Sequence, residues 1–561
     1  MRDQQSTRSA AEPGTGPPLG STRELTALSA GRRHDLDALR AFAMLLGVAL
    51  HAALSFTGKP WIVVDSHSDE SLAFFGQAVH GFRMQLFFLV SGFFAALVCN
   101  RRGMKAMLKN RLARILVPCL LALVTIQPLM ILVAMRANTP PDGQAGDTPL
   151  IRTIRANDAE SVDRMLGAGA LVEKADPQHG IKPLSWAVLG GQTDIVRILL
   201  AKGGNFETEN RDGARPLHAA AFMGRPEAAK LLLDRGADPK AKTNSGDTVM
   251  DVSFADADTT QGIAQAIGIP IDDWDQLEEG RKAVRELIAG ELGLEQQEND
   301  EAWNLLGSYQ ALLSSDQWRV GPFHLIYTGI FGHLWFLWFL CWLVALQALI
   351  MTIGARMDWG AVGSKPPLWA GLALAVVLSA LFQAFMGIST PGFGPDTATG
   401  ILPPPHLLAY YAVFYLFGAY YFSFDSRHDS LGYLWWLWLP LALGILLPAG
   451  LAWREDRLLS VLLQTGYAWL MTLGMIGVFH RFLNWQNQTI RYCADSAYWL
   501  YLAHLPLVVW TQGLVRDWPM PALVKFSLVT AGCMVLLVAS YQLLVRHTWL
   551  GKLLNGPRKI L

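Results

Sequence analysis

The chain has 561 residues, of which 52% are hydrophobic and only 16% are charged. Soluble domains carry about 25% charged residues, so this composition excludes a wholly soluble protein and indicates a membrane body. The formal net charge is zero and indicates no particular partner, and we expect no nucleic acid as a binding partner. The five cysteines form neither a disulfide framework nor a metal-binding motif.

Residues 1–31 are rich in Ser, Pro, Gly and Thr and contain no apolar core. This composition predicts a disordered tail. A cleaved signal peptide is not expected, because it would need an apolar core. The membrane domain is predicted over residues 32–136 and 323–550, and a cytoplasmic tail follows at 551–561.

Ten apolar stretches of the membrane domain are predicted to be transmembrane helices, because a bilayer core of about 30 Å needs about 20 apolar residues of helix. Tryptophans at the ends of several stretches are typical of the membrane interface. The ten stretches are residues 36–57, 76–98, 115–136, 324–351, 367–389, 406–424, 432–452, 459–479, 494–514 and 522–545.

Lysine and arginine are concentrated in alternate loops. The loop 99–114 contains six of them, whereas the loop 390–405 contains none. Cytoplasmic loops of membrane proteins carry the excess of Lys and Arg, so both termini are predicted to be cytoplasmic. The long segment 137–322 is then predicted to lie outside the cytoplasm, in the periplasm if the protein is in a bacterial inner membrane.

Four short runs with a shared pattern recur in this long segment, beginning at Gly146, Gly180, Gly213 and Gly246. The glycines are 34, 33 and 33 residues apart, close to the ankyrin period of 33. The run Arg-Pro-Leu-His-Ala-Ala that contains His218 is similar to the ankyrin signature, in which the histidine is structural. We predict ankyrin repeats over 146–255, acting as a protein-interaction module or as a rigid spacer.

Residues 256–317 contain 14 acidic and three basic residues. An acidic helical cap or linker is predicted over 256–322, because the terminal repeat of an array needs a polar cover. The predicted fold class is all-α: a polytopic membrane helix bundle of about ten transmembrane helices with an inserted ankyrin-repeat α-solenoid.

The first predicted span contains three ionisable side chains, Asp37, Arg40 and His51. Arg40 and His51 are eleven residues apart, which places them within about 20° on one helix face and about 16 Å apart along the axis. Ionisable groups are costly in lipid, so this face is predicted to line a polar cavity that runs up from the cytoplasmic side. Imidazole titrates near neutrality, so His51 suits a general base.

The sequence resembles the acyltransferase 3 family, because five motifs stand in the family's order. The run around Phe82-Arg83-Met84 is most similar to the glucan-modifying branch, although Gln85 replaces the Pro or Asp expected there. The five motifs are Leu36-Asp37-x-Leu39-Arg40 followed by His51, His80 to Phe94, Arg111 to Pro118, His333 to Leu337, and Ser496 to Pro506.

This resemblance implies a membrane O-acyltransferase that moves an acetyl or succinyl group to a hydroxyl of an extracytoplasmic glycan. Acyl-CoA is the implied co-substrate, and no bound cofactor and no metal are expected. The implied catalytic residues are His51 as base, Arg40, and Asp37 as the partner of Arg40.

Six further residues are expected to bind substrate. Near the cytoplasmic face, arginine forks suit the phosphates of the donor, although lipid headgroups are an alternative. On the outer side, an arginine and a histidine one turn apart hold the acceptor or an acyl carboxylate, or cap a helix interface. Two later histidines bind substrate, stabilise an oxyanion, or are structural. In that order, the residues are Arg111 and Arg114, Arg83 and His80, and His333 and His504.

Two other functions remain open. Ten spans with buried charge also fit a transporter or flippase of a polar solute, which would use the same cavity without bond chemistry. A membrane-tethered ankyrin protein with an inactive enzyme body is the third hypothesis, although retention of Arg40 and His51 argues against it.

Overall fold

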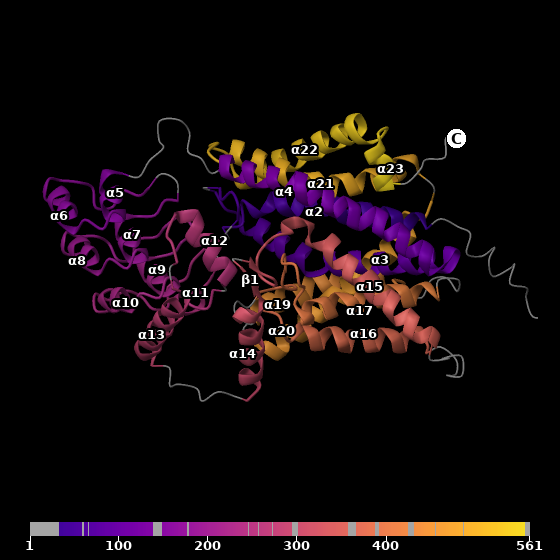
Figure 1. The fold of residues 1–561 in the computed structure, drawn as a ribbon, viewed down its shortest axis with the longest axis horizontal. Helices are drawn as coiled ribbons and strands as arrows, with labels where there is room; N and C mark the ends of the chain where they lie inside the picture. The colour runs from indigo at the N-terminus through magenta and orange to yellow at the C-terminus, as the bar shows by residue number, and fades with distance from the viewer. Residues whose placement is uncertain are drawn as a thin grey trace, which may run out of the picture.

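The chain forms two bodies, a bundle of long helices and an array of short helices beside it (Figure 1). The predicted tail 1–31 lies outside the described residues, as does the end of the predicted tail 551–561. The structure, a computed structural model, describes residues 33–555 apart from 59–60, 66, 138–147, 177–178, 245, 256, 272, 294–300, 322, 357–365, 388–391, 425–430, 455 and 486.

A helix or a run of helices occupies each of the ten predicted apolar stretches. The bundle is built from α2 (His34–Leu54), α3 (Glu70–Arg111), η1 (Leu112–Leu116), α4 (Val117–Ala137), η3 (Gly332–Leu334), α15 (Trp335–Arg356), α16 (Leu368–Gln383), α17 (Pro405–Phe422), α18 (Trp435–Leu441), η6 (Ala442–Leu446), α19 (Leu447–Ala452), α20 (Arg457–Phe482), α21 (Gln488–Val515), α22 (Ala522–Ser540), η7 (Tyr541–Val545) and α23 (Trp549–Asn555).

The predicted all-α membrane fold is confirmed. Among the described residues, six helical runs are long and apolar enough to cross a membrane, and one of them joins α3, η1 and α4. The six runs are His34–Leu54, Glu70–Ala137, Gly332–Gly354, Trp435–Ala452, Arg457–Phe482 and Ala522–Val545.

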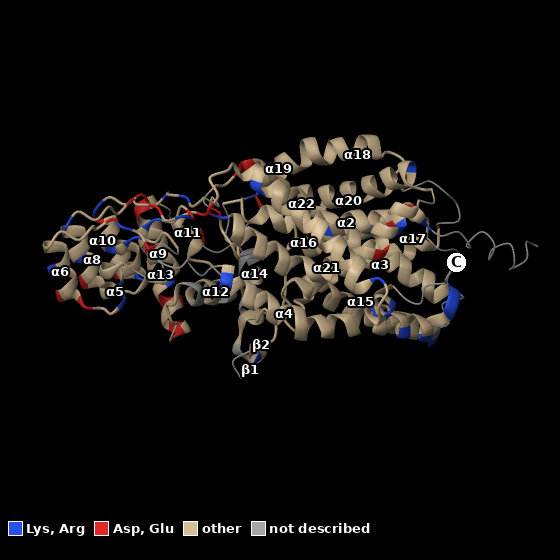
Figure 2. Cartoon of the chain, turned by 90° about the horizontal axis from the view of Figure 1, so that it is seen from above, with Lys and Arg blue, Asp and Glu red and all other residues tan. Residues whose placement is uncertain are grey.

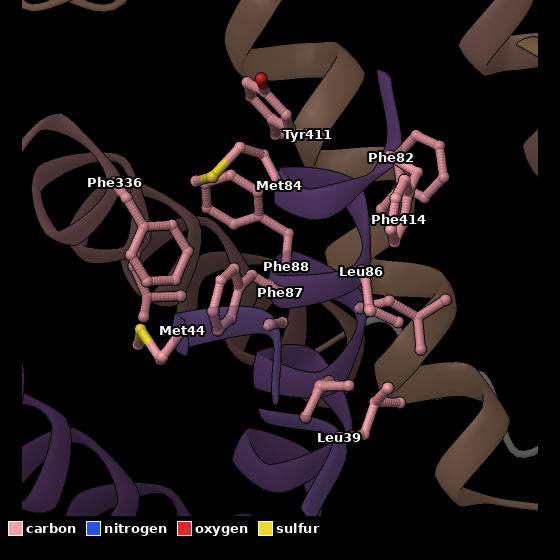
Figure 3. Close-up of a cluster of buried hydrophobic side chains, with 14 of the residues drawn as sticks. Leu39, Met44, Phe82, Met84, Leu86, Phe87, Phe88, Phe336, Tyr411 and Phe414 are labelled. Atoms are coloured by element: carbon pink, nitrogen blue, oxygen red, sulfur yellow. The ribbon is translucent and has the colours of Figure 1, made fainter. Parts of the chain in front are cut away.

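Aromatic side chains of α3, α15 and α17 form the centre of the bundle (Figure 3). The ring of Phe88 lies 4.6 Å from that of Tyr411 and 4.9 Å from that of Phe336, measured between centroids. Such tilted pairs add to the stabilisation from packing. Met44 from α2 lies beside the same cluster, which fixes α2 against α3.

Helices α3 and α17 approach each other most closely at two glycines. A Cβ atom on Gly92 would lie 1.8 Å from the carbonyl oxygen of Tyr415, and one on Gly418 would lie 1.9 Å from that of Leu89. Small residues allow membrane helices to pack backbone against backbone. Gly92, which lies within the motif His80 to Phe94, is therefore required by helix packing.

Gly92→Ala is expected to destabilise the membrane domain, because a backbone oxygen cannot move aside as a side chain can. Overpacking typically costs about 1–3 kcal/mol. Thermal unfolding of the purified protein in detergent measures the effect. Gly532→Ala in α22 is the matched control, since a Cβ there meets nothing within 4 Å. Equal midpoints for the two variants would contradict this account of the α3–α17 contact.

The inserted array consists of antiparallel helix pairs, as predicted for ankyrin repeats. In three pairs the first helix begins at a proline, whose missing N–H costs nothing in the first turn. A four-residue helix, α11 (Val249–Val252), follows the fourth glycine of the repeat pattern, Gly246. The pairs are α5 (Pro149–Arg155) with α6 (Ala159–Gly167), α7 (Pro183–Leu189) with α8 (Thr193–Ala201), and α9 (Pro216–Phe222) with α10 (Pro226–Leu233).

The side chain of His218 ties the third repeat to the fourth. Its Nδ1 accepts the backbone N–H of Arg215 at 3.2 Å, and its Nε2 lies 3.1 Å from the carbonyl oxygen of Ala241, to which it donates. The predicted structural role of His218 is thus confirmed. Burial lowers the pKa of His218, although the nearby Asp212 partly opposes this shift.

The repeat array is expected to lose stability as the pH falls below about 6.5, the ordinary pKa of histidine. The folded pKa of His218 is lowered, so the unfolded state binds the proton more tightly and protonation favours unfolding. Hydrogen exchange of peptides from the array, corrected for intrinsic rates, measures this between pH 5 and pH 8, a range that brackets that pKa. His218→Gln should flatten the pH dependence of the array's stability. An unchanged profile in this variant would show that another titratable group causes the pH dependence.

Three helices follow the array, α12 (Ala257–Ile267), α13 (Trp274–Leu292) and α14 (Glu301–Ser314), and α13 packs on α9, α10 and α11. Arg281 on α13 is fully buried and donates to the carbonyl oxygens of Phe222 and Ala255. This helix therefore covers the end of the array.

The chain then returns to the bundle through a turn of η2 (Asp316–Trp318) and an antiparallel pair, β1 (Arg319–Val320) and β2 (Phe323–His324), which the sequence analysis did not predict. The Tyr309 hydroxyl on α14 lies 2.8 Å from Nδ1 of His406, at the start of α17.

The array also contacts the bundle through the loops after α2 and before α20. A Cβ on Gly58 would lie 3.5 Å from Cβ of Asn244, and one on Gly246 would lie 3.2 Å from Nη2 of Arg454. Lysines and arginines of the bundle gather at the opposite end, around the end of α3 (Figure 2). The array and the basic end therefore lie at opposite ends of the bundle.

Candidate active site

Helix α2 carries the three predicted catalytic residues on one face. Arg40 Nη2 lies 3.8 Å from Asp37 Oδ1, and the Arg40 side chain is 41% exposed. Between Arg40 and His51, however, Met44 and Gly47 are buried. The predicted open cavity along this face is therefore corrected: side chains pack its middle, and the two residues belong to separate clusters.

The first cluster contains three histidines from three different elements. The Nδ1 atom of His51 lies 2.8 Å from the carbonyl oxygen of Gly47 and 3.1 Å from Nε2 of His504. The His504 ring is 5.6 Å from that of His333, between centroids. His504 and His333 are buried, whereas His51 is partly exposed. His51, His333 and His504, predicted from separate motifs, are thus brought together.

A proline in α21 helps to hold His333 in this cluster. Pro506 has no N–H, so the carbonyl oxygen of Leu502, four residues earlier, lacks its helical donor. That oxygen lies 3.1 Å from Nε2 of His333 and accepts its N–H. In return, the Tyr501 hydroxyl donates to the backbone carbonyl of His333 at 2.6 Å.

Arg83 on α3 completes the histidine cluster. Its guanidinium fills the space beside Gly47, where a Cβ atom would lie 2.1 Å from Nη1. The Nε atom is buried and without a hydrogen-bond partner, and no acidic side chain pairs with Arg83 among the residues that the structure describes. A largely buried cation without a counter-ion is costly, so this position suits an anionic group of a ligand.

The loop between α2 and α3 covers His51, a feature that the sequence analysis missed. The rings of Trp61 and His51 are 5.8 Å apart between centroids, and Trp61 Nε1 donates to Gln512 at 3.1 Å. The amide of Gln512 donates in turn to the backbone carbonyl of His51 at 2.9 Å. Lys525 anchors the loop through a fully buried ion pair with Asp65, at 2.9 Å.

His80, predicted to act beside Arg83, contacts a different element. Its Nε2 lies 2.9 Å from the carbonyl oxygen of Pro395 in the loop before α17. A pocket near this loop is lined by residues from α16, α20 and the connections beside them, and it includes neither Arg40 nor His51. Its lining residues are Gln383, Met386, Gly387, Gly392, Gly394, Arg454, Arg457, Ser460, Val461 and Gln464.

The second cluster is basic and lies at the junction of α3 and α4. Arg111 and Arg114 are close enough to Arg40 to repel it. Two nitrogens of Arg111 are buried without a hydrogen-bond partner, and neither Arg111 nor Arg114 forms an ion pair within the described part of the chain. The π-helical turn η1 presents the Arg114 carbonyl to the Tyr498 hydroxyl at 2.7 Å. Such a cluster of unpaired arginines suits a phosphate ligand.

Comparison with known proteins agrees with this arrangement. The family model described as an acyltransferase domain matches residues 33–146 and 292–542, and a model for three ankyrin repeats matches residues 150–243. The two matches coincide with the bundle and with the inserted array.

Curated relatives match over a shorter region. The chain is 37% identical over 94 residues to glucans biosynthesis protein C of Escherichia coli K12, and 36% identical over 94 residues to the protein of the same name from Escherichia coli O1:K1. These matches cover 17% of this chain and 24% of each relative. The chain thus spans about a quarter of the length of the curated relatives it matches.

Proposed function

Because this chain belongs to the acyltransferase 3 family, we propose that it is a membrane O-acyltransferase that acylates an extracytoplasmic glycan. The acyl group is of the acetyl or succinyl class, acyl-CoA is the donor, and a glycan hydroxyl is the acceptor. The observation that carries the proposal is the cluster in which the partly exposed His51 lies beside the unpaired guanidinium of Arg83.

The donor binds through the basic cluster. Arg111 and Arg114 form no ion pair among the described residues, Arg40 contacts only Asp37 at 3.8 Å, and guanidinium forks suit the phosphates of CoA. About 16 Å of helix separates Arg40 from His51, a length that an extended pantetheine arm can span. Because Met44 and Gly47 are buried between the two clusters, the side chains packed there must move apart before the thioester reaches the histidine cluster from the basic end.

His51 acts as the base in the transfer step. Its Nε2 takes the proton of the glycan hydroxyl while the hydroxyl oxygen attacks the thioester carbonyl carbon. Arg83 stabilises the negative charge that develops on the carbonyl oxygen or binds a carboxylate of the acyl group. Collapse of the intermediate breaks the C–S bond, and the CoA thiolate leaves with the proton from His51.

Arg83 favours a succinyl over an acetyl group, since a terminal carboxylate would give the guanidinium its missing partner. The relatives are named for glucan biosynthesis, which supports a glucan-like acceptor. We place the basic end and both termini in the cytoplasm, following the Lys and Arg bias, and the ankyrin array in the periplasm of a cell inner membrane. The array recruits a protein partner or restricts access to the outer end of the bundle.

Mass analysis of cell-envelope glycans from cells with and without the protein tests the proposal. An acyl ester on the glycan should appear only when the protein is present, and it should be lost with His51→Gln. A transporter would leave this modification unchanged, and so would a tethered ankyrin protein with an inactive enzyme body.

A further inference from the structure

We propose that His504 is a positioning residue, which accepts the Nδ1–H of His51 together with the Gly47 carbonyl and holds the ring with Nε2 left as the proton acceptor. This inference deepens the proposed function, because it assigns the protonation pattern of the base. It also changes the predicted substrate-binding role of His504.

The backbone determines which nitrogen of His504 carries the proton. Its Nδ1 lies 2.7 Å from the carbonyl oxygen of Tyr501, one turn earlier in α21. A carbonyl oxygen can only accept, so Nδ1 must carry the hydrogen. In the neutral ring, Nε2 then has a lone pair, and this atom faces His51.

The same argument applies to His51. Its Nδ1 lies 2.8 Å from the carbonyl oxygen of Gly47 and 3.1 Å from Nε2 of His504, and both of these atoms are acceptors. One hydrogen on Nδ1, shared between them, satisfies both contacts. His51 Nε2 is therefore the nitrogen that retains a lone pair, as the base needs.

Burial makes this arrangement dependent on His504. The His504 side chain is 2% exposed, so water does not replace its acceptor readily. The Gly47 contact alone fixes one edge of the imidazole, whereas the His504 contact from α21 also fixes the position of α2 relative to α21. Gln512, two turns further along α21, holds the backbone of the same histidine at 2.9 Å.

Two substitutions separate an acceptor role from simple packing. His504→Leu removes the acceptor, and His504→Gln retains a side-chain oxygen that accepts the His51 N–H. We expect His504→Leu to lower kcat at least about tenfold, with little change in KM for donor or acceptor, as for other residues that orient a catalytic histidine. His504→Gln should recover most of that loss. Equal kcat values for both variants would overturn the proposal.

A double variant tests whether His504 acts through His51. In the His51→Gln background, His504→Leu should cause no further decrease in kcat, since residues that act as a unit are not additive. A further decrease of similar size would show that His504 acts independently and would overturn the positioning role.

Nitrogen-15 spectra of histidine-labelled protein in bilayers test the tautomer without requiring turnover. His51 Nε2, assigned by its loss in His51→Gln, should appear as an unprotonated ring nitrogen in the wild type and in His504→Gln. In His504→Leu the Gly47 carbonyl still accepts from Nδ1, so this tautomer should persist and the Nδ1 resonance should shift toward that of a more weakly hydrogen-bonded N–H. A protonated Nε2 in the wild type would overturn the inference. If the tautomer is as predicted but no acyl transfer is found, the proposed function fails and the positioning contact stands.

Discussion

Replacing His51 with glutamine is expected to reduce acyl transfer by about 100- to 10,000-fold, the usual contribution of a general base. Glutamine cannot take up a proton, whereas its length allows it to keep the contact with Gly47 or His504. The fold should therefore survive, because the aromatic core of α3, α15 and α17 does not include this side chain. The loss should appear in kcat more than in KM.

The measurement is the rate of acyl ester formation by purified protein in detergent or nanodiscs, with thermal unfolding as a check on the fold. His406→Gln is the matched control, since His406 is a histidine at the start of α17 that contacts Tyr309 outside the cluster. It should retain near-wild-type turnover. A His51→Gln protein with at least half of the wild-type rate would exclude His51 as the base.

Replacing Arg83 with methionine is expected to abolish most acyl transfer and, at the same time, to raise the unfolding temperature. The guanidinium lies largely buried beside Gly47 without an acidic partner among the described residues, so an apolar side chain of similar length removes a desolvation penalty. Opposite changes in stability and activity are typical of a residue that is kept for function.

Turnover with succinyl-CoA and with acetyl-CoA, measured beside thermal unfolding, tests this prediction. If Arg83 binds a terminal carboxylate, Arg83→Met should lose more activity with the succinyl donor than with the acetyl donor. Equal losses would instead indicate stabilisation of the oxyanion. A variant that unfolds at a lower temperature and keeps its activity would show that Arg83 is structural.

The fold was largely predictable from the sequence because two sequence patterns, the long apolar stretches and the regular repeat spacing, each extend over many residues. Each apolar stretch is about as long as a bilayer is thick, and the ankyrin glycines recur with almost constant spacing. The short hairpin of β1 and β2 was missed, since two-residue strands have no periodicity to detect. The π-helical turns η1, η6 and η7 were missed for a similar reason.

The site was predictable only in part, because helical periodicity relates residues on one helix and not residues on different helices. The shared face of Arg40 and His51 follows from their spacing, but Arg83, which separates them, comes from α3. Gln512 and Trp61 carry no charge, so nothing in the sequence indicated that they would lie beside His51. Lys525 could have been found as an ionisable residue within a span, although its partner Asp65 could not.

Transfer across a sealed membrane tests the central claim most directly. Vesicles of known orientation are given labelled acyl-CoA on the face that exposes Arg111 and Arg114, and a glycan acceptor on the face that carries the ankyrin array. Label should accumulate in the glycan with the wild-type protein and remain at background with His51→Gln. No label with the wild type, or equal label with both proteins, would contradict acyl transfer at the histidine cluster.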